Sequence, residues 1–261
     1  MFMKGFDGNA LASVSIIIPY YGDSINQLFK CVLAIEKQSY PGDRIEVLII
    51  DNNKSQKINR QFASSKCVRI IHEPQIGSYA ARNKGIEAAS GEVLAFTDSD
   101  CLPGQEWLEN GLIALANNPD TNVVGGRIIF TFRDDAEPNL FELIDSTIHL
   151  RQVDYVKTMN YAATANLFAR RSTFLEFGEF DSHYRSGGDR EWGDRLKGNG
   201  VLFLYAPEAI VYHPARTTIR SLINKNRRAV GGELLRLRKH GHSNVEIFQA
   251  QWKAFFIRTI Y

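Results

Sequence analysis

Two carboxylates, Asp98 and Asp100, stand one residue apart at the end of an apolar run. The run, residues 93–97, does not alternate between apolar and polar positions, which is typical of a strand buried on both faces. Carboxylates this close repel each other, and a divalent cation that prefers oxygen ligands, such as Mg²⁺ or Mn²⁺, offsets the repulsion. The pair therefore indicates a metal site, and the alternative is a turn in which one aspartate caps the next helix.

A second set of charged residues lies earlier in the chain. Asp51 ends another apolar run, and Arg82 and Lys84 lie in a predicted helix that follows the loop ending at Gly77. A helix N-terminus and two cations facing several acids favour a phosphate and a metal bound between them. The alternative for the two cations is a solvated helix face with ordinary surface ion pairs.

The second half of the chain adds a further acid and a lone histidine. Gly188 precedes Asp189 at the predicted start of a helix that also carries Glu191 and Trp192, and an acid in that position commonly caps the helix. His213 follows a short apolar run, and a lone histidine is either a hydrogen-bonded structural group or a metal ligand.

Strands and helices alternate through the first hundred residues. Apolar runs at 14–18, 47–50, 68–71 and 93–97 are separated by helical patterns, which predicts an α/β fold with a mostly parallel sheet and helices on both faces. In such a sheet Asp51, the loop at Gly77 and the aspartate pair meet at one edge. Beyond it we expect a helix over 103–117, a strand over 123–130 with a glycine bend, and a helix over 139–150.

Composition sets the class of protein. The chain has 261 residues, 44% of them hydrophobic and 23% charged, as in an ordinary globular domain. A net charge of +2 is by itself no sign of a nucleic-acid partner, and we expect none. Three widely spaced cysteines, a polar N-terminus and the lack of a run of ~18 apolar residues favour a cytoplasmic protein, either free or peripheral at the inner face of a membrane.

The C-terminal part is basic. Between residues 216 and 239 eight cations accompany one acid, and apolar residues recur at helical spacing, so we expect basic amphipathic helices with a break at Gly231-Gly232. Such a helix either lies on an anionic membrane surface or docks on the domain with its basic face solvated. The chain ends in an aromatic-rich apolar segment, 252–261.

The order and spacing of these motifs resemble the family 2 glycosyltransferases, over about residues 14–213. The matching segments are 14–21, 49–53, Gly77 with 81–85, 97–100, 168–171 with 177–181, and 188–192 with Arg195. There are two departures. Gly188 stands where the family usually has an acid, and the second-strand motif continues as Asp51-Asn52-Asn53, which leaves the contacts of Asn53 with base and ribose open.

The resemblance implies a GT-A fold with a Rossmann-like sheet, and an inverting transfer of a sugar from a nucleoside diphosphate donor. It implies a UDP-sugar donor, a Mn²⁺ or Mg²⁺ cofactor, and a carbohydrate or lipid-linked acceptor in polysaccharide or glycolipid synthesis. The roles it implies are a catalytic base at Asp189; metal ligands at Asp98, Asp100 and His213; donor contacts at Pro19, Tyr20, Tyr21, Asp51, Asn53, Gly77, Arg82, Lys84, Asp98 and Ser99; and an acceptor region at Ala163, Thr164, Gly188, Glu191 and Trp192.

The chemistry agrees with these roles, because a carboxylate can take the proton of an attacking hydroxyl and a metal can neutralise a leaving diphosphate. We expect a glycosyltransferase domain over 1–215, with donor binding at about 14–100 and the acceptor and catalytic part at about 101–215, and a helical extension over 216–261 that contacts the membrane. A nucleotidyltransferase is one alternative. An inactive, membrane-associated binding module is the other, although the intact Asp98, Asp100 and Asp189 argue against it.

Overall fold

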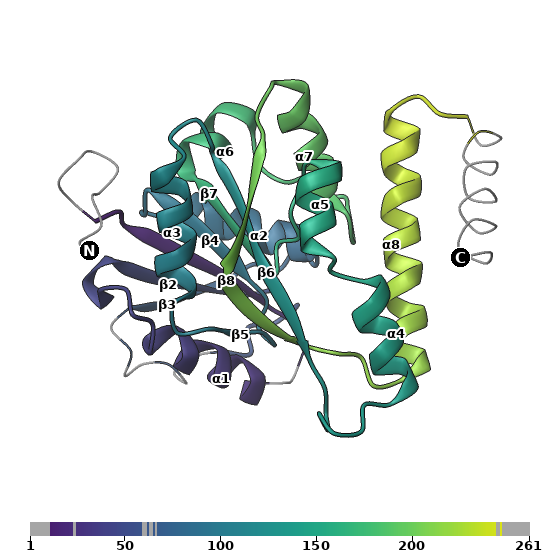
Figure 1. Cartoon of the computed structure of the whole chain (residues 1–261), viewed down its shortest axis with the longest axis horizontal. Coiled ribbons are helices and arrows are strands. Elements are labelled where there is room, and N and C mark those ends of the chain that lie inside the picture. The colour runs from purple at the N-terminus through teal and green to yellow at the C-terminus, as the bar shows by residue number, and fades with distance from the viewer. Residues whose placement is uncertain are drawn as a thin grey trace.

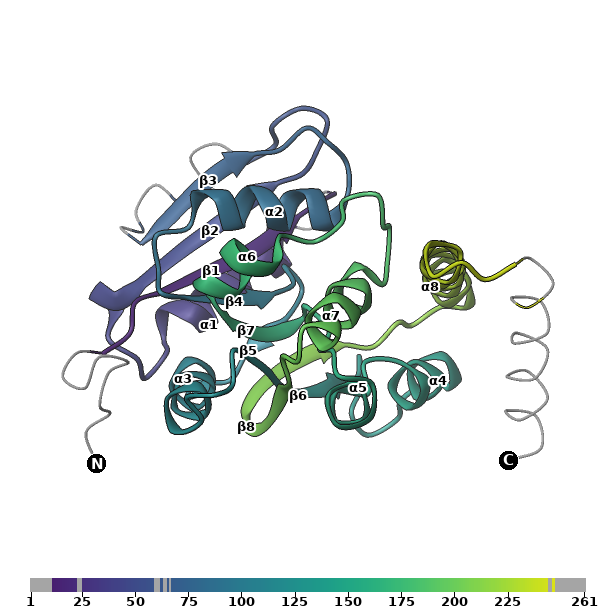
Figure 2. The same cartoon turned by 90° about the horizontal axis from the view of Figure 1, so that it is seen from above.

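The computed structural model describes residues 11–22, 25–58, 62, 65, 67–243 and 246. They form one eight-stranded sheet with helices on both faces (Figures 1 and 2). The strand order is β3-β2-β1-β4-β7-β6-β8-β5. The strands are β1 Val14–Tyr20, β2 Ile45–Asp51, β3 Val68–His72, β4 Val93–Thr97, β5 Leu102–Pro103, β6 Val123–Thr131, β7 Asn166–Arg170 and β8 Phe203–Pro214. The helices are α1 Ile25–Glu36, α2 Ser78–Ala88, α3 Trp107–Asn117, α4 Leu140–Ile148, α5 Gln152–Met159, α6 Arg171–Phe177, α7 Gly188–Gly198 and α8 Ile219–Lys239.

The first half of the sheet confirms the four predicted strands and the helices after β1 and β3, whereas the described residues between β2 and β3 form no helix, and residues 59–61, 63, 64 and 66 lie outside the described part of the chain. β1, β2, β3 and β4 pair only in parallel with one another. The side chains of β1, β2 and β4 are largely buried on both faces: in β1, Ile16 and Ile18 pack into one apolar core and Ile17 into the other. This explains why the sequence of these strands does not alternate.

The second half contains a strand of opposite direction. β7 lies antiparallel between β4 and β6, whereas β6 and β8 are parallel to each other. The mostly parallel α/β sheet is therefore confirmed, with β7 and the two-residue β5 as the reversed strands. Because Asn166 opens β7 opposite Thr97, the chain enters β7 at the edge where β4 ends. Residues 132–165, which include α4 and α5, leave β6 and return to this edge.

Each face of the sheet has its own apolar core. α1 and α3 cover one face, and the residues expected to point inward from the helix at 103–117 are buried there: Trp107, Leu108, Leu112 and Leu115. α2, α6 and α7 cover the other face (Figure 2). The expected glycine bend is also present, as a register shift in β6 between Gly126 and Arg127.

α8 is one continuous helix, so the prediction of a break at Gly231-Gly232 was wrong. A Cβ atom at Gly232 would overlap the carbonyl oxygen of Ser186, whereas one at Gly231 would meet nothing within 4 Å. Gly232 therefore lets α8 approach the loop before α7 without interrupting the helix. Residues 244, 245 and 247–261, and with them the aromatic-rich end, lie outside the described residues. Within the described part of the chain, no helix has both the length and the apolar character needed to cross a bilayer.

These two glycines give a matched test of how α8 is attached. We expect Gly232→Ala to lower the free energy of unfolding by about 1–3 kcal/mol, because the methyl group forces α8 away from Ser186. Gly231→Ala should instead raise it by up to about 1 kcal/mol, since alanine is the better helix former and has open space there. Denaturant unfolding followed by circular dichroism measures both; equal effects of the two changes would contradict the close contact.

Candidate active site

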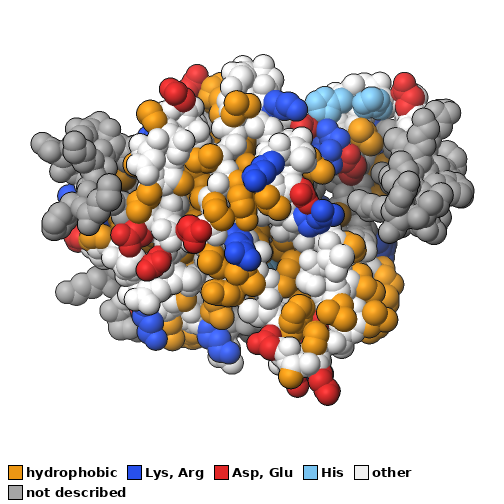
Figure 3. Space-filling model, viewed as in Figure 1, with side chains coloured by type: hydrophobic (Ala, Val, Ile, Leu, Met, Phe, Trp, Pro, Cys, Tyr) orange, Lys and Arg blue, Asp and Glu red, His pale blue; other side chains and the backbone are white. Residues whose placement is uncertain are grey.

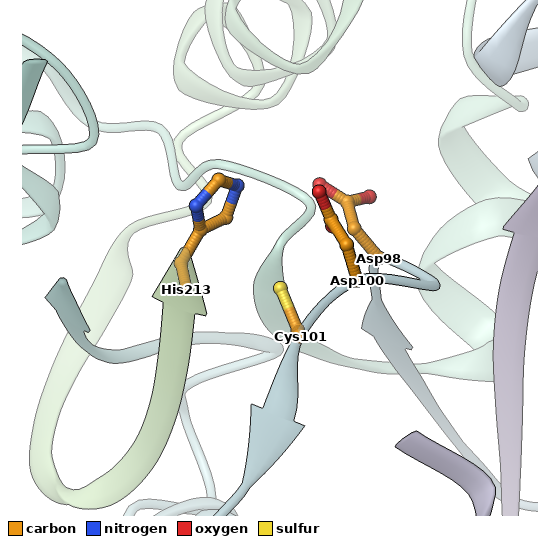
Figure 4. Close-up of side chains that lie close together, drawn as sticks. All are labelled: Asp98, Asp100, Cys101 and His213. Carbon is orange, nitrogen blue, oxygen red and sulfur yellow. The ribbon is translucent and has the colours of Figure 1, made fainter. Parts of the chain in front are cut away.

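Four side chains from two strand ends converge at the edge of the sheet. Asp98, Asp100 and Cys101 follow β4, and His213 lies near the end of β8. One potential ligand atom from each lies within 4.8 Å of the others. Figure 4 shows the two carboxylates side by side, facing the imidazole of His213. The structure thus brings together the three residues predicted as metal ligands.

The hydrogen bonding of His213 leaves one ring nitrogen available. Nδ1 lies 2.8 Å from the carbonyl oxygen of Pro214. A carbonyl only accepts hydrogen bonds, so Nδ1 carries the proton and Nε2 of the neutral ring keeps its lone pair. This is the arrangement by which a backbone carbonyl fixes the tautomer of a metal-binding histidine.

Burial and charge distinguish Asp100 from Cys101. Burial raises the pKa of Asp100 and the nearby Asp98 raises it further, while His213 lowers it; a cation at this point would relieve the repulsion. Burial and the same two aspartates raise the pKa of the Cys101 thiol well above its usual value. Sulfur ligands suit softer metals than Mg²⁺ or Mn²⁺, which prefer oxygen and imidazole ligands. The set is therefore two carboxylates and an imidazole, which fits Mg²⁺ or Mn²⁺, and Cys101, which sequence reasoning did not single out, lines the site.

The two cations predicted beside the acids separate. Arg82 is buried on α2, and its Nη2 atom donates to Asp98 Oδ1 at 2.6 Å. Lys84 lies on another side of the helix and pairs with Glu87 at 2.8 Å. The structure therefore places Arg82 in the site and gives Lys84 the surface ion pair that was the alternative.

Asp189 lies in the first turn of α7, where the helix dipole favours a carboxylate. Its Oδ1 accepts a hydrogen bond from the hydroxyl of Tyr79 at 3.1 Å, and its Oδ2 one from the backbone N–H of Thr164 at 3.4 Å. A Cβ atom at Gly188 would come within 2.9 Å of the Tyr79 ring, which explains the glycine where the family usually has an acid. Tyr79 was missed from the sequence; its signal was its place on α2, three residues before Arg82.

Tyr79 and Arg82 connect the two groups of carboxylates. The guanidinium of Arg82 lies 5.4 Å from the centroid of the Tyr79 ring. Tyr79 thereby contacts Asp189 through its hydroxyl and Arg82 through its ring, and Arg82 contacts Asp98. The candidate base and the candidate metal ligands are held together by one face of one helix.

The loops after β2 and before α2 are built by hydrogen bonds rather than by apolar packing. Asp51 accepts from the backbone and side chain of Asn53 and from the backbone N–H groups of Lys57 and Ile58. Burial alone would raise the pKa of Asp51, but these hydrogen bonds outweigh it and hold the pKa below its usual value. Asp51 therefore shapes the loop that follows it.

Asn52, which sequence reasoning did not assign, positions Gly77. Its Oδ1 accepts from the backbone N–H of Gly77 at 2.8 Å, and its Nδ2 donates to the carbonyls of Glu73 and Gln75. Gly77 has φ +151°, a conformation that favours glycine, and it precedes α2.

The remaining predicted residues fall into two groups. Pro19, Tyr21, Ser99 and Ala163 lie at or beside the edge where the metal-type residues gather: Pro19 near the end of β1, Tyr21 just beyond it with 66% of its surface exposed, Ser99 between the two aspartates, and Ala163 in the segment before β7. Tyr20 and Trp192 instead pack in the apolar cores, and Trp192 stacks on Phe174 with ring centroids 4.5 Å apart.

Trp192 is fully buried, so its assignment to the acceptor region was wrong: no part of its ring is free to touch a substrate. Its Nε1 donates to the carbonyl of Gly178. Glu191, next to it, forms an ion pair with Arg195 at 3.0 Å within α7.

Comparison with known proteins shows which proteins this chain resembles. The profile of glycosyl transferase family 2 matches residues 15–174. Glycosyltransferase AglE of Haloferax volcanii is 36% identical over 231 residues, which are 87% of this chain and 74% of that protein. A glucosyl-dolichyl phosphate glucuronosyltransferase of the same organism is 24% identical over 68% of this chain and 58% of its own length.

A solved structure agrees with the fold. The mannosyltransferase PcManGT of Pyrobaculum calidifontis, determined with GDP-mannose and Mn²⁺, superposes with a TM-score of 0.68 at 19% identity, over 89% of this chain and 65% of that one. This likeness confirms the expected GT-A fold. From the profile match and the archaeal relative, the chain belongs to glycosyl transferase family 2.

Proposed function

We propose that this protein is an inverting, metal-dependent transferase that moves a sugar from a nucleoside diphosphate donor to an acceptor hydroxyl, with Asp189 as the base. The observation that carries the proposal is the connection of Asp189 through Tyr79 and Arg82 to the cluster of Asp98, Asp100 and His213. A proton acceptor and a cation-binding group held at a fixed separation are what a single displacement requires.

In this reaction Asp189 takes the proton of the acceptor hydroxyl as its oxygen attacks the anomeric carbon. Hydrogen bonds from Tyr79 and from the backbone of Thr164 hold the carboxylate in place. One displacement without a covalent intermediate inverts the configuration. Asp98, Asp100 and His213 would hold a Mn²⁺ or Mg²⁺ ion, which supplies positive charge to the leaving diphosphate when bound. Arg82 orients Asp98 and adds a second positive charge beside it.

For the donor we propose a UDP-sugar, bound by the loops after β1 and β2. The hydrogen bond from the Gly22 N–H to Asn53 Oδ1 joins these two loops. The similar mannosyltransferase was determined with GDP-mannose, so guanosine donors belong in the same assay.

For the acceptor we propose a lipid-linked carbohydrate at a membrane surface, and α4 supports this. Its acids Glu142 and Asp145 are turned inward and buried. Its apolar side chains are turned outward: Leu140 is 66% exposed, Ile144 37% and Ile148 48%. Figure 3 shows hydrophobic side chains gathered over this helix. A contiguous stripe of apolar side chains exposed to water marks a surface that contacts a membrane or another partner.

α8 continues this stripe. Asn139 donates to the carbonyl of Thr217, and His149 lies 3.0 Å from Asn226, so α4 runs alongside the first half of α8. Ile219 and Ile223 are both at least half exposed on that half, next to the exposed Arg220. Exposed acids in the loop before α4, among them Asp134, lie at one end of the stripe. We therefore expect apolar insertion to contribute as much as attraction to anionic lipid.

The base assignment is tested by Asp189→Asn, which keeps the shape but cannot accept the proton. We expect transfer to fall about 10²–10⁴-fold, with donor affinity unchanged. The assay is release of nucleoside diphosphate from a panel of UDP- and GDP-sugars with Mn²⁺. Asp194→Asn on the same helix, which weakens the pairs with Arg236 and His240 and leaves Asp189 untouched, should keep transfer. Full activity of a folded Asp189→Asn enzyme would reject the base role, and release of pyrophosphate would point to a nucleotidyltransferase.

The metal assignment is tested by binding. We expect His213→Ala to weaken Mn²⁺ binding about 100-fold in isothermal titration calorimetry, because an imidazole ligand is lost. Cys101→Ala should leave the affinity unchanged, since sulfur is a poor ligand for Mn²⁺. Chelation should abolish turnover. Equal losses of Mn²⁺ affinity in the two variants would show that the sulfur of Cys101 is a ligand.

Membrane docking is tested by sedimentation with phosphatidylglycerol vesicles. We expect the double variant Ile144→Ser, Ile223→Ser to have a lower affinity for the vesicles, by roughly tenfold for each apolar side chain removed, and therefore a smaller sedimented fraction. Leu175→Ser is the matched control, because Leu175 is 79% exposed but lies on α6, away from the stripe. If the control lost binding equally, or if no form of the protein bound, the stripe would have another role.

A further inference from the structure

A pocket of about 500 Å³ lies between α8 and the loop that precedes α7. The loop contributes His183 and Arg185, and α8 contributes Asn224, Arg227 and Arg228 among others. None of the lining residues is acidic. The pocket therefore carries positive charge and is suited to an anion.

The cations of this part of the chain divide into two groups. Those that fasten α8 are neutralised: Arg216 pairs with Asp145, Arg236 with Asp194 and Glu233, and Lys239 with Asp181. In the described part of the chain, Arg185, Lys225, Arg227 and Arg228 have no acid within 4.0 Å. The acids near α8 thus form their ion pairs close to the two ends of the helix, and the positive charges in its middle have no acidic partner among the described residues.

Two of these cations, Lys225 and Arg228, are repelled by Arg216. Burial lowers the pKa of Arg228, and repulsion from Arg216 lowers it further. The pKa of Lys225 is lowered by burial, then by Arg216, with Asp189 and Asp98 acting in the opposite direction. Lys225 therefore lies in the electrostatic field of the catalytic carboxylates, and Arg228 lies one helical turn further along α8.

The pocket also adjoins the catalytic helix. Gly231 and Gly232 line it, and Gly232 is in contact with Ser186, three residues before Asp189. Arg190, directly after Asp189, pairs with Glu233 of α8 at 3.1 Å. A ligand in the pocket is thus separated from Asp189 by only the first turn of α7.

We propose that this pocket binds a phosphate group of the acceptor substrate. The inference rests on the proposed function and names the acceptor class: a phosphate ester whose sugar hydroxyl reaches Asp189. Two guanidinium groups fit the oxygens of a phosphate, and its negative charge offsets the uncompensated charge of Arg227 and Arg228. The donor diphosphate belongs to the other group of residues, at Asp98, Asp100 and His213. A sugar joined to an isoprenyl phosphate and a soluble sugar phosphate both present such a phosphate, and farnesyl phosphate serves as the probe for the lipid form.

The test measures binding without turnover. Farnesyl phosphate, used below its micellar concentration, is titrated into the full chain, with farnesol and glucose 6-phosphate as the other probes. We expect Arg228→Gln and Arg227→Gln each to weaken farnesyl phosphate binding about tenfold, the loss typical of one charge-assisted contact. Arg220→Gln removes an equal charge from the same helix outside the pocket and should have no effect.

Farnesol should bind far more weakly than farnesyl phosphate. Tighter binding of farnesyl phosphate than of glucose 6-phosphate would assign a lipid acceptor, and the reverse a soluble one; both support a phosphate site. Equal effects of Arg228→Gln and Arg220→Gln, or no affinity for either phosphate, would overturn it. Donor hydrolysis with Mn²⁺ is measured on the same samples: if it is present while phosphate binding is absent, the inference fails and the proposed function stands. Phosphate binding without any donor hydrolysis would reject the function and keep the pocket.

Discussion

The hydrogen bond between Tyr79 and Asp189 joins parts of the chain that lie 110 residues apart, and the geometry of the site depends on it. Tyr79 reaches Asp189 because α2 lies very close to the sheet. A Cβ atom at Gly85 would come within 2.5 Å of the Ile17 side chain, so only glycine permits that distance. Gly188 does the same on the other side, where the ring of Tyr79 fills the space of a side chain. Two glycines therefore set the separation between the base and the metal-type residues.

The parts of this arrangement that the sequence predicts are those with local causes. β1, β2 and β4 contain uninterrupted apolar runs, the aspartates that follow β4 are separated by a single residue, and α3 shows a clear helical period. The rule that parallel strands end at one edge predicted the position of Asp98 and Asp100, whereas the place of His213 beside them was expected only from the resemblance to the family. Tyr79, by contrast, is a tyrosine in a helix of small residues, and its partner is set by the approach of α7. The prediction that Trp192 lies in the acceptor region has a related cause. Its neighbours in the sequence are charged, but its own face of α7 points into the core.

The C-terminal helix shows a similar limit. Its basic, amphipathic pattern left open whether it docks on the domain or on a membrane, and the structure shows it docked on the domain. One side is fastened to the domain through Asp145, Asp181 and Asp194, while Ile219 and Ile223 stay outside. The acids that neutralise this helix come from three different elements, so no count of charges within 216–239 would reveal which cations remain unpaired.

The reversed direction of β7 has a consequence for how new specificities arise in this architecture. At the edge of the sheet where Asp98 and Asp100 lie, most strands end. β7 begins there instead, because it is antiparallel to β4 and its first residue, Asn166, pairs with Thr97. Residues 132–165 are therefore a module anchored at both ends to the same rim of the sheet. Its length and sequence can drift, or be exchanged between paralogues, without altering the register of any strand. Under the proposed function, acceptor choice can then diversify in evolution while the strands that position Asp51, Asp98 and Asp100 stay as they are.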